Sequence, residues 1–258
     1  MRQLYAFRMP FNTKKDGEVY RPPKINQDRD GWAMHLLIDT QREPFDIVIP
    51  GLNTCADDLT ERSVRSRLRT GDMVLTSTRL GIDDAADKVK TPVLPGCNWL
   101  EGTIVELWHR YIGHCSRKRV ELTEEGAQAL PEGQRDRLAR LEFSDTDDAL
   151  IGDPRLKTRR TVAFIIHGES LWKDGPRCLS IFGMSGAVTF GFASVLAERW
   201  STELRQLTST EIVVAEIIRT GSSLVPASVR GFPDYWRYWD LVIYRSGTET
   251  ILPRDMHA

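Results

Sequence analysis

The spacing of hydrophobic and polar residues predicts that strands and helices alternate along most of the chain. Short apolar runs bounded by turn residues predict strands at 32–39, 45–49, 72–78, 161–168, 177–183, 211–219 and 239–245. Helical spacing of apolar residues predicts helices at 57–69, 101–114 and 185–200. Several strand runs are apolar without alternation, which is typical of strands covered on both faces. The pattern therefore predicts an α/β fold with a mostly parallel, Rossmann-like sheet flanked by helices, forming one sheet or two packed lobes.

Shifts in composition divide the chain into four stretches. Residues 1–30 are polar and rich in turn signals, and are expected to form an N-terminal arm. A first α/β part is predicted at 31–120 and a second, Rossmann-like part at 161–258. The stretch between them, 121–160, is helical and charged, and is interpreted as a connection.

Residues 178–197 contain no charged side chain and are long enough to cross a membrane as a helix. Seven of these twenty residues are Gly, Ser or Thr, which weakens insertion into a bilayer. The spacing also changes from a β-type run to a helical one at Gly183-Met-Ser-Gly186. The segment is therefore predicted to be a buried strand, turn and helix of a soluble protein with no membrane partner.

Charge and cysteine content narrow the partners and the compartment. The 258 residues carry 35 basic and 36 acidic side chains, a net charge of −1, which disfavours nucleic acid as a partner. The N-terminus lacks the apolar run of a secretory signal, and the four cysteines form no CxxC pair. Reduced thiols and a cytoplasmic location are expected. The cysteine and histidine spacing matches no zinc pattern, so no metal site is predicted.

The turn between the predicted strand and helix at Gly183–Thr189 is the first candidate site. Backbone N–H groups at such a turn, together with the helix dipole, favour an anion. Gly183, Gly186 and the hydroxyl groups of Ser185 and Thr189 are the candidate ligand-binding groups. The structural alternative is that the glycines only permit a tight turn and close packing of the helix on the strand.

Three further residues are expected to complete this site. Arg79 and Arg219 each close a predicted strand and would supply positive charge, and Trp172 would flank the ligand. The expected function is binding of a small anionic ligand at strand carboxyl ends, most simply a nucleotide or a nucleotide-derived signal. No cofactor is specified by these residues.

Two other classes of function stay open. A hydrolase would use Ser185 or His167, because a strand, a Gly-Met-Ser-Gly turn and a helix have the layout of a nucleophile elbow without its full GxSxG motif. An assembly component, pairing with a copy of itself or with another protein, would use the aromatic segment at 234–240.

Residues 163–193 and the following EIVVAEI resemble a module of uncharacterised bacterial proteins that look like Rossmann-type ligand or nucleotide sensors. Trp172, Gly183 and Thr189 occupy the comparable positions. The Asn-Pro pair that usually precedes the aromatic residue is replaced by Ser170-Leu171. The resemblance, which spans 163–217, implies a Rossmann-like fold and a nucleotide-type ligand.

Overall fold

The computed structural model describes fourteen stretches of the chain. They are residues 2–6, 13–15, 18–20, 24–41, 45–48, 61–77, 99–115, 120–130, 158–168, 170–184, 186–207, 211–220, 239–245 and 248–252. The helices are α1 (Lys24–Thr40), α2 (Glu61–Arg67), α4 (Trp99–His109), α5 (Glu124–Gln128), α8 (Gly186–Arg199) and α9 (Ser201–Arg205).

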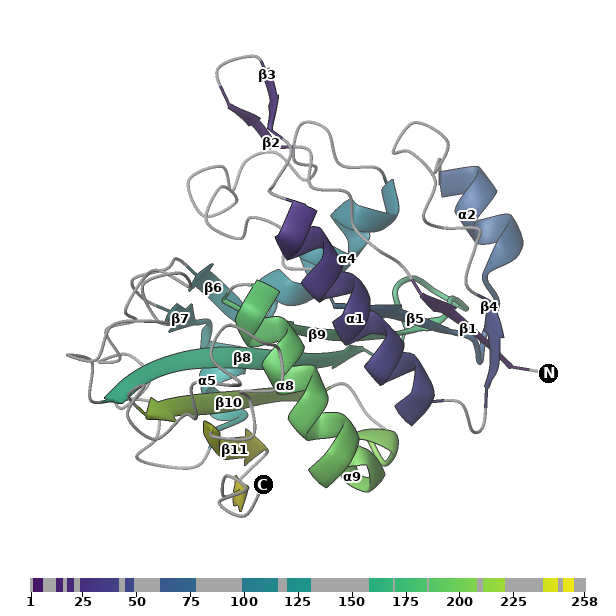
Figure 1. Ribbon diagram of the computed structural model, residues 1–258. Coiled ribbons are helices and arrows are strands. Elements are labelled where there is room, and N and C mark those ends of the chain that lie inside the picture. The colour runs from purple at the N-terminus through teal and green to yellow at the C-terminus, as the bar shows by residue number, and fades with distance from the viewer. Residues whose placement is uncertain are drawn as a thin grey trace.

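One sheet of eight strands forms the centre of the protein (Figure 1). From edge to edge it contains β12 (Thr248–Leu252), β11 (Trp239–Arg245), β10 (Glu211–Thr220), β8 (Thr158–Gly168), β9 (Arg177–Gly183), β5 (Met73–Thr76), β1 (Gln3–Ala6) and β4 (Asp46–Val48). Two hairpins lie outside it: β2 (Thr13–Lys15) with β3 (Glu18–Tyr20), and β6 (Ile112–Cys115) with β7 (Val120–Leu122).

The prediction of a mostly parallel sheet is wrong. β1 pairs in parallel with β4 and β5, and β5 with β9, whereas the ladders β9–β8, β8–β10, β10–β11 and β11–β12 are antiparallel. Short connections explain two of the antiparallel ladders, β8–β9 and β11–β12, since parallel neighbours need a crossover of about a dozen residues or more. Only residues 169–176 join β8 to β9, and only 246–247 join β11 to β12. The apolar runs reflect burial of both faces, which an antiparallel sheet also shows when helices cover both sides.

Each strand sends alternate side chains into two separate cores. Along β8, Phe164 and Ile166 face the core under α2 and α4, whereas Ala163 and Ile165 face the core under α1, α8 and α9. Figure 1 shows α1 and α8 crossing one face of the sheet and α4 lying behind it. The sheet is therefore the middle layer of three.

The stretch 32–39, predicted as a strand, lies in α1. Ala33, Met34, Leu37 and Ile38 are buried, a helical spacing that places them on one side, and Trp32 is exposed. That side packs against the sheet and α8, where Trp32 also meets the ring of Phe190 edge-on at 5.8 Å. A short apolar run fits either period, and packing against α8 decides for the helix here.

The other predicted elements are confirmed within the described ranges, with two helices shortened. The predicted helix at 57–69 ends at Arg67 as α2, and residues 57–60 lie outside the described residues. The predicted helix at 101–114 ends at His109 as α4, because the chain turns at Arg110–Tyr111 into strand β6. Strands from 31–120 and from 161–258 share one sheet, and the predicted arm contributes β1 to its interior. Within the described ranges, no helix combines the length and apolar character needed to cross a bilayer.

Candidate functional site

The turn from β9 to α8 is held together by its own residues. The Gly183 N–H donates to the Thr189 hydroxyl at 3.0 Å, and the Thr189 side chain is 2% exposed. A Cβ on Gly183 would lie 2.8 Å from the Thr189 nitrogen and closer still to the Val188 side chain. Both residues thus close the packing of α8 on β9, as the structural alternative requires. Gly186 is the first residue of α8, and Ser185 lies outside the described residues.

The residues expected to complete this site are spread over the molecule. Trp172 lies before β9, and Gly183 lies at its far end, about 20 Å away at 3.3 Å per residue. The structure therefore does not bring Trp172 to the turn. Arg219 lies in β10 opposite Arg159, at the same end of the sheet as Gly183. Arg79 and most of the aromatic segment 234–240 lie outside the described residues.

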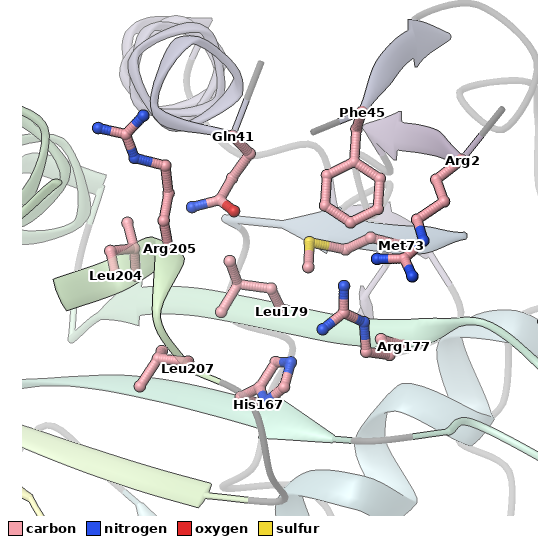
Figure 2. Close-up of a pocket in the computed structure, with 10 residues that line it drawn as sticks. All are labelled: Arg2, Gln41, Phe45, Met73, His167, Arg177, Leu179, Leu204, Arg205 and Leu207. Atoms are coloured by element: carbon pink, nitrogen blue, oxygen red, sulfur yellow. The ribbon is translucent and has the colours of Figure 1, made fainter. Parts of the chain in front are cut away.

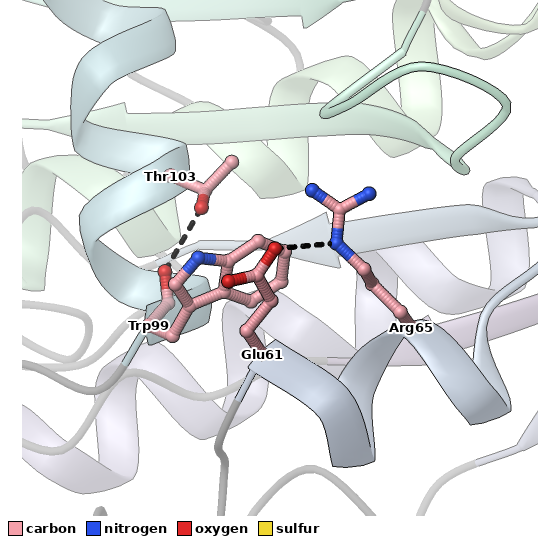
Figure 3. Close-up of polar contacts among 4 residues, drawn as sticks. All are labelled: Glu61, Arg65, Trp99 and Thr103. Carbon is pink, nitrogen blue, oxygen red and sulfur yellow. Dashed lines mark hydrogen bonds and ion pairs between the residues drawn. The ribbon is translucent and has the colours of Figure 1, made fainter.

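Trp172 belongs instead to a cluster that ties the β8–β9 connection to α2 and α4. Figure 3 shows Glu61, Arg65 and Trp99 of this cluster. The Arg65 guanidinium carbon lies 5.3 Å from the ring centroids of both Trp99 and Trp172, and the two rings are 5.2 Å apart. Glu61 accepts a hydrogen bond from the Arg65 Nε at 2.8 Å. A Cβ on Gly175 would lie 2.7 Å from the Trp172 ring, so a glycine is needed for the ring to fold over the connection. These contacts give Trp172 a structural role.

His167 lies at the end of the sheet opposite to Gly183. It pairs with Leu179 on β9, whereas Gly183 pairs with Ala163, four residues earlier on β8. This separates the two positions by about 13 Å along the strand. His167 therefore lies at the opposite end of the strands from Gly183, and Ser185, the other residue considered for a hydrolase, lies outside the described residues.

His167 does, however, line a pocket of about 180 Å³ that the sequence analysis missed (Figure 2). The pocket opens at the amino ends of the neighbouring strands β1, β5 and β9, on the face of the sheet covered by α1 and α9. Its lining residues are Arg2, Gln41, Phe45, Met73, His167, Arg177, Leu179, Leu204, Arg205 and Leu207.

The register of the strands assembles this lining. Met73 pairs with Leu4 on one side and with Arg177 on the other, and Leu179 pairs with His167. Residues paired across a ladder share a face, so Arg177 and His167 project on the same side of the sheet as Met73. Gln41, directly after α1, and Leu204 and Arg205 of α9 complete the pocket from the helical layer. Segments that are far apart in the sequence therefore meet at the amino ends of β1, β5 and β9.

Positive charge dominates the polar part of the pocket. Arg2 and Arg177 extend toward one another beside Met73 (Figure 2). Burial lowers the pKa of Arg177, and the nearby positive charge of Arg2 lowers it further. Arg177 also lies over the Phe45 ring, with its guanidinium carbon 5.6 Å from the centroid. A guanidinium stays protonated at neutral pH despite such a shift, so two cations face the same small space.

No carboxylate is among the described residues that line the pocket, but three adjoin lining residues along or across the strands. Asp46, next to Phe45, is exposed, and its backbone N–H donates to the Arg2 carbonyl oxygen at 2.9 Å. Asp72 accepts backbone N–H groups from Gln3 and Arg69, each at 2.9 Å. Glu211, paired with His167 across the ladder, accepts two hydrogen bonds from Arg245. The pocket therefore presents cationic groups without a described anionic partner.

Two nearly buried polar side chains also line the pocket. His167 is 1% exposed and Gln41 is 2% exposed, and both are among the lining residues. Buried polar groups are retained where they find partners, and here they face the same space as the guanidinium groups. Within the described ranges no group of three or more His, Cys, Asp and Glu side chains is placed to hold a metal ion.

Comparison with known proteins found no match to this chain among family models, curated proteins or solved structures. The pocket is defined by its geometry and chemistry. The available signal in the sequence was the position of two arginines directly before apolar strand runs, at Arg2 and Arg177. That signal becomes specific only when the strand order is known, because β5 separates these two strands.

Proposed function

We propose that the protein binds a small anionic ligand in the pocket beside Arg2 and Arg177. The observation that supports this most directly is the approach of two guanidinium groups, one of them partly buried, with no carboxylate among the described lining residues. Like charges that approach one another are unfavourable, the more so where one is partly buried, and an anion between them relieves the repulsion. Arginine is also the side chain best suited to hold a carboxylate or phosphate, because its planar donors match both groups.

The volume limits what enters the pocket. About 180 Å³ corresponds to roughly six water molecules at about 30 Å³ each. Pockets for whole drug-sized ligands are larger, from about 300 Å³. The space suits a single phosphate, sulfate or carboxylate group, and a nucleotide would place only a phosphate in it, with the sugar and base outside.

Binding of inorganic phosphate and of acetate by Arg177→Gln and the wild type, measured by isothermal titration calorimetry, tests the proposal. Loss of a charge-assisted hydrogen bond of about 1.5–3 kcal/mol should weaken binding by at least tenfold in the variant. Arg62→Gln, on the exposed side of α2, is the matched control and should bind as the wild type does. Equal affinities in Arg177→Gln and the wild type, or no binding of either anion, would refute the proposal.

A further inference from the structure

The donors of the pocket reach it from different directions, and this distinguishes one anion from another. Arg177 and His167 rise from β9 and β8, Arg2 precedes β1, and Gln41 and Arg205 come from the helical layer (Figure 2). A carboxylate is planar, and a single guanidinium satisfies both of its oxygens. A phosphate presents oxygens in several directions and accepts hydrogen bonds from all of them.

Resting on the proposed anion-binding function, we propose that the ligand's anionic group is a phosphate with two negative charges, and that His167 selects it over a carboxylate. A free phosphate ion and the phosphate of a monoester share this chemistry. The step involved is protonation of the imidazole as the dianion binds, with solvent as the source of the proton.

His167 is placed for this role by its neighbours. On β9, Leu179 is the ladder partner of His167, and Arg177 lies two residues before Leu179. Arg2 and Arg205 line the same pocket. Glu211 lies opposite His167 on β10, and its carboxylate is engaged by Arg245, with Arg245 Nη2 donating to Oε2 at 3.2 Å. Among the described residues that line the pocket beside the ring, the permanently charged side chains are arginines. Histidine changes charge near neutral pH, so a bound dianion supplies the negative charge that a protonated ring needs.

Arg2 and Arg177 already match the single charge of a carboxylate, whereas the Arg205 Nε donates to the Ser201 carbonyl of its own helix at 3.2 Å. Once two guanidinium groups have met the carboxylate, protonation of His167 would add an excess positive charge to the pocket. A dianion favours the protonated ring and raises the pKa of His167 in the complex. The added affinity is then present at lower pH and is lost as the pH rises through that raised pKa.

The test measures proton uptake during binding. Methyl phosphate, inorganic phosphate and acetate are titrated into the full chain at pH 8 in two buffers of different ionisation enthalpy, and the difference gives the protons taken up. A phosphomonoester is a dianion at this pH, because its second pKa is about 6. We expect methyl phosphate to bind at least tenfold more tightly than acetate and to carry net proton uptake, and acetate to carry none. Comparable binding of methyl phosphate and inorganic phosphate assigns the site to any phosphate group, whereas binding of inorganic phosphate alone assigns it to the free ion.

His167→Gln keeps a polar side chain in place of the imidazole, and His35→Gln, on the exposed side of α1, is its control. In His167→Gln the proton uptake should disappear, methyl phosphate should bind at least tenfold more weakly, and acetate should change less than twofold. If acetate binds as tightly as both inorganic phosphate and methyl phosphate, or if the wild type takes up no proton with either phosphate, this inference is overturned even if His167→Gln fails to fold. In that case the proposed anion binding still stands; absence of any anion binding refutes both.

Discussion

The residues at the two ends of β9 differ in what they do. At the carboxyl end, Gly183 and Thr189 bond to each other and pack tightly, so their polar groups are used within the fold. At the amino end, Arg177 and Arg2 hold two positive charges together over an apolar floor. The first arrangement contributes to stability, whereas the second opposes it. Residues that oppose stability are the stronger indication of binding, since proteins accept local strain and repulsion mainly at functional sites.

The largest expected effect on stability is at the carboxyl end of β9, where Gly183→Ala should lower the free energy of unfolding by about 2–3 kcal/mol. The new Cβ would lie 2.8 Å from the backbone nitrogen of Thr189, which cannot move without shifting α8. The free energy of unfolding, from urea denaturation followed by circular dichroism, measures this.

Gly113→Ala is the control, because a Cβ there meets its neighbours at 3.6 Å or more. Its stability should stay within about 0.5 kcal/mol of the wild type. If Gly183→Ala were as stable as Gly113→Ala, the turn would have room for more than packing, and its role as a ligand site would gain support over the pocket at the other edge.

A smaller loss, about 1–2 kcal/mol, is expected for Thr189→Val. The replacement keeps the shape of the side chain and leaves the buried Gly183 N–H without its acceptor. Thr202→Val in α9, at an exposed position, should have little effect in the same denaturation experiment. The comparison would be reversed if Thr189→Val kept its stability and instead lost anion binding in calorimetry, because the hydroxyl would then serve a ligand.

The sequence predicted the strands and helices of the second half well because each is long and strongly patterned. β8, β9, α8 and β10 all lie where their apolar spacing indicated. The errors concern choices that a local pattern does not determine. α1 was taken for a strand because its short apolar run fits both periods, and contact with α8 decides between them.

The orientation of neighbouring strands and the pocket depend on long-range pairing. Residues 169–176 are too few for a parallel crossover, so the loop length already indicated an antiparallel β8–β9 pair. Arg2 and Arg177 are 175 positions apart in the chain. They come close because their strands β1 and β9 both pair with β5, where Met73 aligns with both Leu4 and Arg177. The sequence analysis placed the expected anionic ligand at Gly183–Thr189, whereas the candidate pocket lies at the opposite end of β9, beside Arg177.

The smallest expected effect is a gain in stability at the amino edge. Arg177→Met should stabilise the protein by about 0.5–1 kcal/mol at low ionic strength, in a buffer without phosphate or carboxylate. Because burial and Arg2 lower the pKa of Arg177, the folded protein holds this charge less favourably than the unfolded chain does. Methionine keeps an apolar contact with Phe45, which offsets the lost contact between the guanidinium and the ring.

Salt should reduce this gain, since screening weakens the repulsion between Arg2 and Arg177 in the wild type. Arg62→Met on α2 provides the control and should leave the free energy of unfolding unchanged. A loss of more than about 1 kcal/mol in Arg177→Met would mean that Arg177 stabilises the fold through its own contacts. The residues at both ends of β9 would then stabilise the fold, and the repulsion between the two guanidinium groups would no longer indicate a ligand.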